Sequence, residues 1–297
     1  MTMPFLETQS NWRETLTSLH RAARILATMH RLTRDPLPNY LELALHVTPT
    51  GLATARLPRG GQAALDFTQP ALVYTPAARL SSPQLRGDAQ RFPLRGHSQA
   101  SLLADFFTAL RGADLADVLP AGGDVSPAVL DALAVRGRRK APALETLLDA
   151  APLVIAPQAA ADYAAVVYSL FTALARFRAR LSGLMTPLVM WAEHFDLSTL
   201  WFPGAQADEW QPHLNFGFAP YSAGIEAPYL YAYAYPYPAR FDPPRLPAGA
   251  DWHTSGWTGV VLPYAVIAAQ ADGEGFVEAS CAAIFDALVP LLGGDGA

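Results

Sequence analysis

Lysine and cysteine are almost absent from this chain of 297 residues. Lys140 is its one lysine, in the loop-like sequence VRGRRKAP, and Cys281 is its one cysteine. A Walker lysine follows a Gly-rich strand-to-helix loop, and a pyridoxal-phosphate lysine lies in a buried pocket, so the surroundings of Lys140 argue against both classes of enzyme. A single cysteine excludes an intrachain disulfide and a zinc site built from several cysteines.

Common enzyme signatures and targeting segments are also missing. The sequence contains no G-x-S-x-G, H-E-x-x-H or G-x-G-x-x-G motif. The net charge of −5 argues against binding to nucleic acid or to anionic membranes. The chain does not start with a basic segment followed by an apolar one, and its most apolar run, 163–175, is too short to span a bilayer. We therefore expect a cytoplasmic protein with no nucleic-acid or membrane partner.

The hydrophobic pattern predicts long helices separated by groups of strands. Helical spacing covers 11–31, 98–110, 159–182 and 275–292. Extended segments precede the second of these helices at 41–47, 52–57, 63–68, 71–75 and 91–95, and precede the last one within 186–238 and at 259–263. This order predicts an α+β fold, with an antiparallel sheet or two half-sheets and the long helices packed on one side.

The two halves of the chain follow the same plan of helix, strands and helix. We expect a first half over 1–112, a connector rich in Pro, Gly and Ala over 113–158, and a second half over 159–297, packed as one globular unit. The segment LATARLP at 52–58 matches LSTLWFP at 197–203, and FPL at 92–94 matches VLP at 261–263. These matches favour an internal duplication, although antiparallel strands with similar turns also resemble one another by chance.

Several segments spread over nearly the whole chain carry a family resemblance. They are LTSLH at 16–20, HVTPTGLAT at 46–54, FDL at 195–197 and YAYAYPYP at 231–238. The sequence thereby resembles a bacterial family of unknown function, of the DUF5996 type, which implies no established activity and no catalytic residues. Members carry an acidic, His-containing stretch just before the second long helix, where this chain has IAPQAAADYAA at 155–165. A site that uses that stretch would be altered here.

The first candidate site contains histidines and one carboxylate. In a strand His194 and Asp196 would share a face, because side chains alternate. A His and an Asp two residues apart can bind a metal together or act as an oriented base. His213 and His253 would complete a metal site if all four side chains converge, whereas in the alternative interpretation Asp196 caps a turn and the histidines lie at sheet edges.

The second candidate is a run of five alternating tyrosines from Tyr229 to Tyr237, with Leu, Ala or Pro between them. An extended strand places all of these phenols on one face and only small or rigid groups on the other. Tyr231, Tyr233 and Tyr235, together with Trp201, could then line a ligand-binding cleft. The simpler alternative is a half-buried sheet face, because aromatic residues are good strand formers.

These candidates support three hypotheses about function. The first is small-ligand binding in an aromatic cleft formed by the tyrosine strand, Trp201 and His213. The second is a metal-dependent or His/Asp-based hydrolase that uses His194, Asp196, His213 and His253. The third is a homodimer that buries the tyrosine face. The sequence identifies no cofactor and leaves enzymatic activity open.

Overall fold

A computed structural model describes residues 3–6, 10–77, 89–115, 147–237 and 242–293. The fold is α+β, as predicted, with antiparallel strands and packed helices. The chain forms two compact units: unit 1 consists of Met1–Phe5 and Ala165–Ala297, and unit 2 consists of Leu6–Ala164. Most of the predicted connector, including Lys140, lies outside the described residues.

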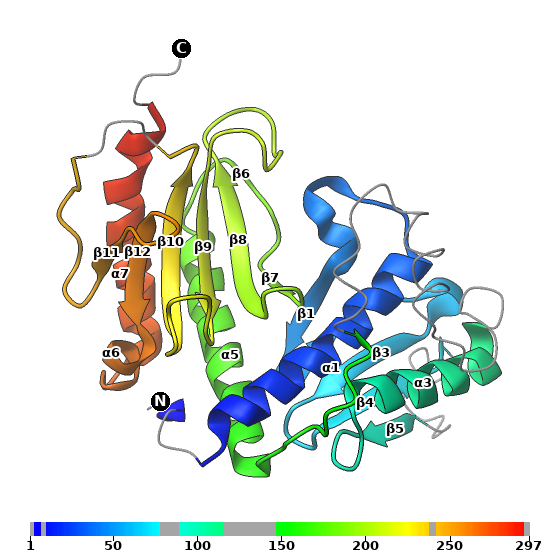
Figure 1. Ribbon diagram of the computed structural model, residues 1–297. Coiled ribbons are helices and arrows are strands. Elements are labelled where there is room, and N and C mark those ends of the chain that lie inside the picture. Colours follow the sequence, from blue (N-terminus) through cyan, green and yellow to red (C-terminus); the bar gives the residue numbers. More distant parts are fainter. Residues whose placement is uncertain (1–2, 7–9, 78–88, 116–146, 238–241, 294–297) are drawn as a thin grey trace. The chain divides into compact units, whose positions relative to one another are not determined.

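Unit 2 is a five-stranded antiparallel meander with two helices on one face. Its strands pair in chain order. Helices α1 and α3 lie across the same face of this sheet (Figure 1), where the Phe92 and Phe106 rings meet edge to face at 5.2 Å. The elements are α1 (Trp12–Thr33), β1 (Ala44–Thr48), β2 (Gly51–Ala53), β3 (Gln62–Asp66), β4 (Ala71–Thr75), β5 (Gln90–Pro93) and α3 (Gln99–Leu110), with short helical turns at Pro38–Leu43, Pro58–Gly60 and Arg111–Leu115.

Alternation along the strands decides which side chains meet these helices. Leu52, Leu65 and Leu72 are completely buried on the helix side. On the opposite side Ala64 and Val73 are only half-buried. One apolar face per strand is what a two-layer unit needs, so the sheet of unit 2 has a packed face and a partly exposed one.

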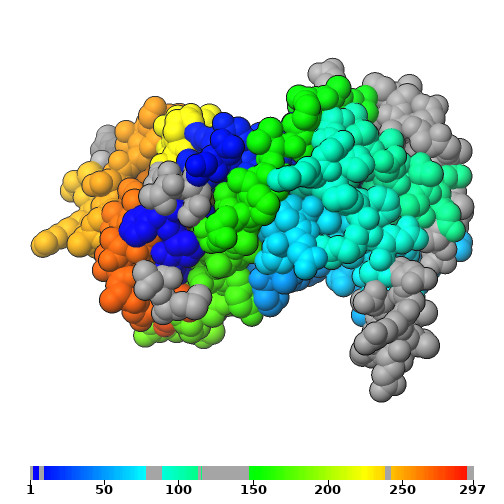
Figure 2. Space-filling model, turned by 90° about the horizontal axis from the view of Figure 1, so that it is seen from below, coloured from blue at the N-terminus to red at the C-terminus, as the bar shows by residue number. Residues whose placement is uncertain are grey.

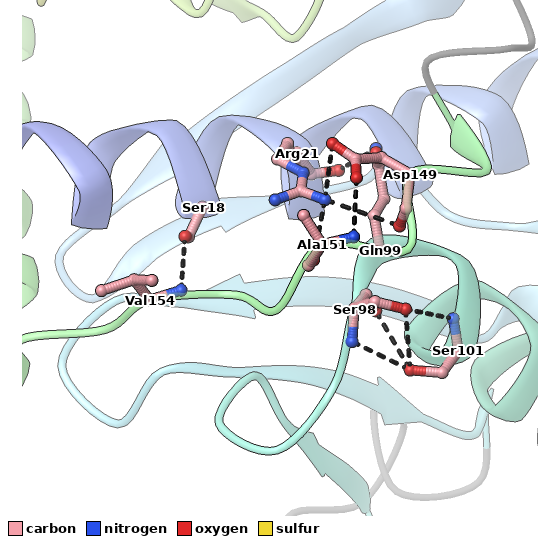
Figure 3. Close-up of polar contacts among 8 residues, drawn as sticks. All are labelled: Ser18, Arg21, Ser98, Gln99, Ser101, Asp149, Ala151 and Val154. Carbon is pink, nitrogen blue, oxygen red and sulfur yellow. Dashed lines mark hydrogen bonds and ion pairs between the residues drawn. The ribbon is translucent and has the colours of Figure 1, made fainter.

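The segment that leads from residue 149 to α5 is tied to α1 by hydrogen bonds (Figure 3). Ser18 accepts the Val154 amide at 2.9 Å, and Thr15 accepts the Ala156 amide at 2.9 Å. Arg21 donates to the Ala151 carbonyl at 3.0 Å and pairs with the Asp149 carboxylate at 2.8 Å. Because these α1 residues recur every three positions, they face the segment together and hold it along the helix.

Figure 3 also includes the start of α3, where Ser98 and Ser101 form a reciprocal capping box. The first residue of that helix, Gln99, is completely buried and donates its amide to the Arg21 carbonyl oxygen at 2.7 Å. The capping box satisfies backbone groups that α3 leaves unpaired at its start, and the Gln99 contact links α3 to the middle of α1.

Unit 1 repeats this architecture with longer strands. Its sheet has the order β11-β12-β10-β9-β8-β7, and β6 also pairs with β8. Helices α5 and α7 lie along the same face of the sheet (Figure 1), and Phe216 of β9 contacts Phe177 of α5 and Phe285 of α7. The elements are α5 (Pro157–Arg178), β6 (Leu184–Met185), β7 (Val189–Trp191), β8 (Asp196–Phe202), β9 (His213–Ala219), β10 (Tyr229–Tyr235), β11 (Asp251–His253), β12 (Gly259–Pro263), α6 (Tyr264–Ala268) and α7 (Gly273–Leu288), followed by a turn at Val289–Gly293.

The C-terminal helical stretch, Gly273–Leu292, is long and apolar enough to cross a membrane by length and composition alone. Of its most apolar window 28% is buried, and Val277, Cys281 and Ile284 are completely buried against the rest of unit 1. Near its start, the Tyr264 hydroxyl donates to the Pro4 carbonyl oxygen at 2.7 Å. The N-terminal residues therefore lie beside the C-terminal part of unit 1 (Figure 2).

The two sheets share one register across five strands. In unit 2 a single row runs through Val47, Leu52, Leu65, Leu72 and Phe92. The corresponding row of unit 1 contains Met190, Leu197, Phe218, Leu230 and Leu262. This register agrees with the match of 52–58 to 197–203, but it aligns Pro93 with Pro263, one residue away from the predicted match. The shared register supports the duplication, which stays a prediction.

Candidate functional site: the tyrosine face of unit 1

The side of the unit 1 sheet opposite α5 and α7 carries the alternating tyrosines of β10. Tyr229, Tyr231, Tyr233 and Tyr235 lie opposite Ala219, Gly217, Asn215 and His213 of β9, respectively. The same face continues on β8 with Asp196 and Ser198, because Ser198 pairs with Gly217. We call this side of β7–β12 the tyrosine face. It lies on the other side of the sheet from the helix-packed Phe216.

A buried carboxylate–phenol pair lies near one end of this face. The Tyr231 hydroxyl donates a short hydrogen bond to Oδ2 of Asp196. Tyr231 crosses the sheet over Gly217 to reach it: a Cβ at Gly217 would press into the Tyr231 ring and lie 2.6 Å from the Leu197 carbonyl oxygen. Glycine on β9 therefore leaves the space that the pair occupies.

Only one oxygen of this carboxylate accepts a hydrogen bond from the described residues. Asp196 is 8% exposed, and its Oδ1 is buried and accepts no hydrogen bond from the described residues. Burial raises the pKa of Asp196, outweighing the opposite effects of the Tyr231 hydrogen bond and of the nearby His194. Burial, together with the charge of Asp196, raises the pKa of Tyr231 well above its usual value. An unsatisfied buried oxygen costs about 1–3 kcal/mol, and such groups concentrate at functional sites.

Aromatic rings surround the pair. Tyr231 and Tyr233 are stacked with their centroids 6.2 Å apart, and the Trp257 ring meets both at 6.3 Å with its plane steeply inclined. The Tyr233 hydroxyl accepts a hydrogen bond from the side-chain N–H of Asn215 at 2.8 Å. The side-chain oxygen of Asn215, Oδ1, is buried without a partner among the described residues. The face thus combines flat apolar rings with acceptor oxygens.

In unit 2 the positions equivalent to the carboxylate–phenol pair carry neither a carboxylate nor a phenol. The shared register places Gly51 at the position of Asp196, Ala53 at that of Ser198, and Val73 at that of Tyr231. Ala64 corresponds to Gly217 by the same register. A five-stranded meander with one helix-covered face therefore forms without the carboxylate–phenol pair. Its presence in unit 1 is not required by this architecture.

The predicted grouping of histidines with Asp196 does not form. His194 lies in the turn before β8 and is exposed, because Phe195 has a φ of 56° and interrupts the alternation that the prediction assumed. His213 lies opposite Tyr235 at one end of β9, whereas Ala219, the β9 residue next to Asp196, lies at the other end. Six residues of strand separate His213 from Ala219, which is a distance of about 20 Å. His253 packs on Trp257 at 4.6 Å. Among the described residues, no group of three or more His, Cys, Asp or Glu side chains could hold a metal ion.

Two predicted members of the aromatic cleft lie elsewhere. Trp201 is five residues from Asp196 and so faces the helices, where it meets Phe285 at 4.9 Å and donates to the Ser182 carbonyl oxygen at 2.7 Å. Strand β10 ends at Tyr235, so Tyr237 lies beyond the alternating run. His213 is at the far end of the tyrosine face, where it stacks on Tyr235 at 5.1 Å, and burial lowers its pKa.

Sequence reasoning missed three residues of this face: Trp191, Ser198 and Asn215. Trp191 donates its indole N–H to Ser198 at 2.9 Å. Period-two alternation from Asp196 and His213 would have pointed to Ser198 and Asn215.

The comparisons with known proteins give a family and no activity. The model of a family of unknown function, DUF5996, matches residues 3–126 and 149–295, so the chain belongs to this family. Neither the search of curated proteins nor the search of solved structures gives a match.

Proposed function

We propose that this member of the DUF5996 family binds a small molecule on the tyrosine face of unit 1. In this proposal the rings of Tyr231, Tyr233 and Trp257 contact the flat or apolar part of the ligand. Asp196 and Asn215 recognise its polar groups. Binding sites commonly combine aromatic area with a few convergent polar atoms in this way.

The unsatisfied Oδ1 of Asp196 is the observation that carries the proposal. Buried polar groups almost always have a partner, so an exception beside a cluster of aromatic rings suggests that a ligand supplies the hydrogen bond. The unit 2 sheet, which has Gly51 and Val73 at the positions of Asp196 and Tyr231, supports the same conclusion. Residues that the architecture does not need are better explained by recognition than by folding.

The other two hypotheses have less support. A metal-dependent or His/Asp hydrolase would need His194, Asp196 and His213 to act together, but His194 is exposed in the turn before β8 and His213 lies about 20 Å from Asp196 along β9. Burial of the tyrosine face in a homodimer would need exposed rings, whereas Tyr229 and Tyr231 are buried already, and Tyr235 is the one strand tyrosine on this face that is more than a third exposed.

The proposal is tested by screening a chemically diverse fragment library by ligand-observed NMR against the purified protein. We expect some fragments to bind the wild-type protein and not the Trp257→Ala variant. Trp210→Ala is the matched control, because Trp210 is 68% exposed and none of the described ring contacts involves it. Binders that survive Trp257→Ala, or a library without any binder, would contradict ligand binding at this face.

A further inference from the structure

We infer that the ligand of the tyrosine face is an organic cation with N–H donors, such as an ammonium or guanidinium compound, and that its N–H binds Oδ1 of Asp196. This inference rests on the proposed function and specifies the chemical class of its ligand. Three independent observations support it: the free acceptor atom, the aromatic rings around it and the charge of the surrounding segment.

The free atom selects a donor. Oδ2 of Asp196 accepts from Tyr231, whereas Oδ1 is buried and has no partner among the described residues. A carboxylate oxygen accepts hydrogen bonds and repels other anions. A donor that also carries positive charge would satisfy the oxygen and compensate the buried charge at once.

The surrounding rings favour the same class of ligand. The face of a Tyr or Trp ring attracts cations through its quadrupole, and the attraction is larger when water is excluded. Tyr229 and Tyr231 are buried, with their ring centroids 6.0 Å apart, and Tyr231 stacks on Tyr233. A cation at Oδ1 would therefore lie beside several ring faces in a site closed to solvent.

The charge of the local sequence also favours a cation. The stretch 186–238, which forms β7 to β10, contains no Lys or Arg. It contains five acidic residues: Glu193, Asp196, Asp208, Glu209 and Glu226. The basic side chain of this stretch that acts on Asp196 is the exposed His194, whose charge solvent screens, so an anionic ligand would meet more like charge than opposite charge in this stretch.

The first experiment compares four probes that share a benzyl or phenyl group: benzylamine, benzyltrimethylammonium, benzyl alcohol and benzoate. Binding to the unmodified protein is followed by tryptophan fluorescence, to which Trp191 and Trp257 of the tyrosine face contribute among the six tryptophans of the chain. We expect benzylamine to bind at least about 10-fold more tightly than the other three, since it alone combines positive charge with N–H donors.

Variants then test the position of the contact. Asp196→Asn should weaken benzylamine about 10-fold or more, because the hydrogen bond to a charged acceptor is lost. Glu193→Gln removes one nearby negative charge that is exposed, and we expect less than about a 2-fold change because solvent screens exposed charges. The probe comparison needs no variant, so it decides the inference even if Asp196→Asn does not fold.

Different failures have different meanings. Equal or tighter binding of benzyltrimethylammonium would overturn the N–H contact to Oδ1. If benzoate or benzyl alcohol binds more tightly than benzylamine, and Trp257→Ala abolishes that binding, the inference is overturned and the proposed function stands. No binding by any probe or library fragment would overturn both.

Discussion

Asp196 and Tyr231 are 35 residues apart in the chain, and three local features bring them together. The positive φ of Phe195 ends the turn so that β8 begins at Asp196 with its carboxylate facing the tyrosines. The β9–β10 register puts Tyr231 opposite Gly217, and the glycine lets the phenol cross to β8. The sequence predicted both residues as site candidates but not their contact, because a contact across three strands depends on register, which no local pattern specifies.

His30 gives unit 2 a titratable residue at its core. It is completely buried at the end of α1, and its Nε2 accepts the Ala55 amide at 3.0 Å. Burial, together with the positive charges of Arg34 and His46, lowers the pKa of His30 to about 3. The folded protein therefore keeps this ring neutral, while the unfolded chain binds a proton below about pH 6.5.

The consequence is a loss of stability in acid. The contribution of His30 is complete above pH 6.5 and is lost as the pH falls from 6.5 towards 3, because the unfolded state then binds one more proton. The free energy of unfolding should fall by up to about 1.4 kcal/mol per pH unit in this window from this residue alone. Urea unfolding of wild type and His30→Gln between pH 6.5 and 4 measures it, and the variant should show the shallower slope. His194→Gln is the control, because His194 is exposed, and its stability should depend on pH as that of the wild type does. If the free energy of unfolding of His30→Gln has the same pH dependence as that of the wild type, His30 is not the cause of the loss of stability.

At the scale of elements, residues 149–156 are held to α1 by side chains rather than by a β-ladder. Thr15 is completely buried, and its hydroxyl accepts the amide of Ala156, just before α5 begins. Removing that acceptor leaves a partly buried N–H without this partner. The contact therefore couples the end of the connecting segment to the first helix within unit 2.

Thr15→Val should lower the free energy of unfolding by about 1–3 kcal/mol, because shape is kept while the acceptor is lost. Thr28→Val is the matched control: Thr28 is also buried on α1, but its hydroxyl donates to the Arg24 carbonyl oxygen of the same helix. Urea unfolding of both variants, with hydrogen exchange at the Ala156 amide, gives the comparison. Equal stability of the two variants would contradict a role for Thr15 in holding the segment.

The helices and the alternating strands were the part of the fold that the sequence predicted well. Hydrophobic periodicity located α1 and α5 to within a few residues, and the strand 259–263 is β12 as predicted. The side of the sheet that Trp201 occupies was predicted wrongly, because a face is assigned by counting from a strand start that the sequence does not reveal. The same uncertainty placed His194 on a strand instead of in a turn.

At the scale of the whole molecule, two sheets with the same register differ in one face. Leu94 donates its amide to the Pro70 carbonyl oxygen at 3.0 Å in unit 2, and Tyr264 donates to the Pro228 carbonyl oxygen at 2.8 Å at the equivalent place in unit 1. Such shared detail supports descent from one repeated unit. In that case the tyrosine face was added to an architecture that both units share. Paired substitutions at equivalent positions of the two sheets can therefore distinguish residues needed for folding from residues needed for binding.

Gly217 and Ala64 are the most informative pair, because they occupy equivalent positions in the two sheets. Gly217→Ala should weaken benzylamine binding about 10-fold or more, since the added Cβ displaces the Tyr231 ring from Asp196. Ala64→Gly should cost about 0.5–1 kcal/mol of stability, as glycine does within a strand, and leave benzylamine binding unchanged. Fluorescence titration and urea unfolding of both variants test this asymmetry. Undiminished binding by Gly217→Ala would show that the crossing of Tyr231 over β9 does not build the site.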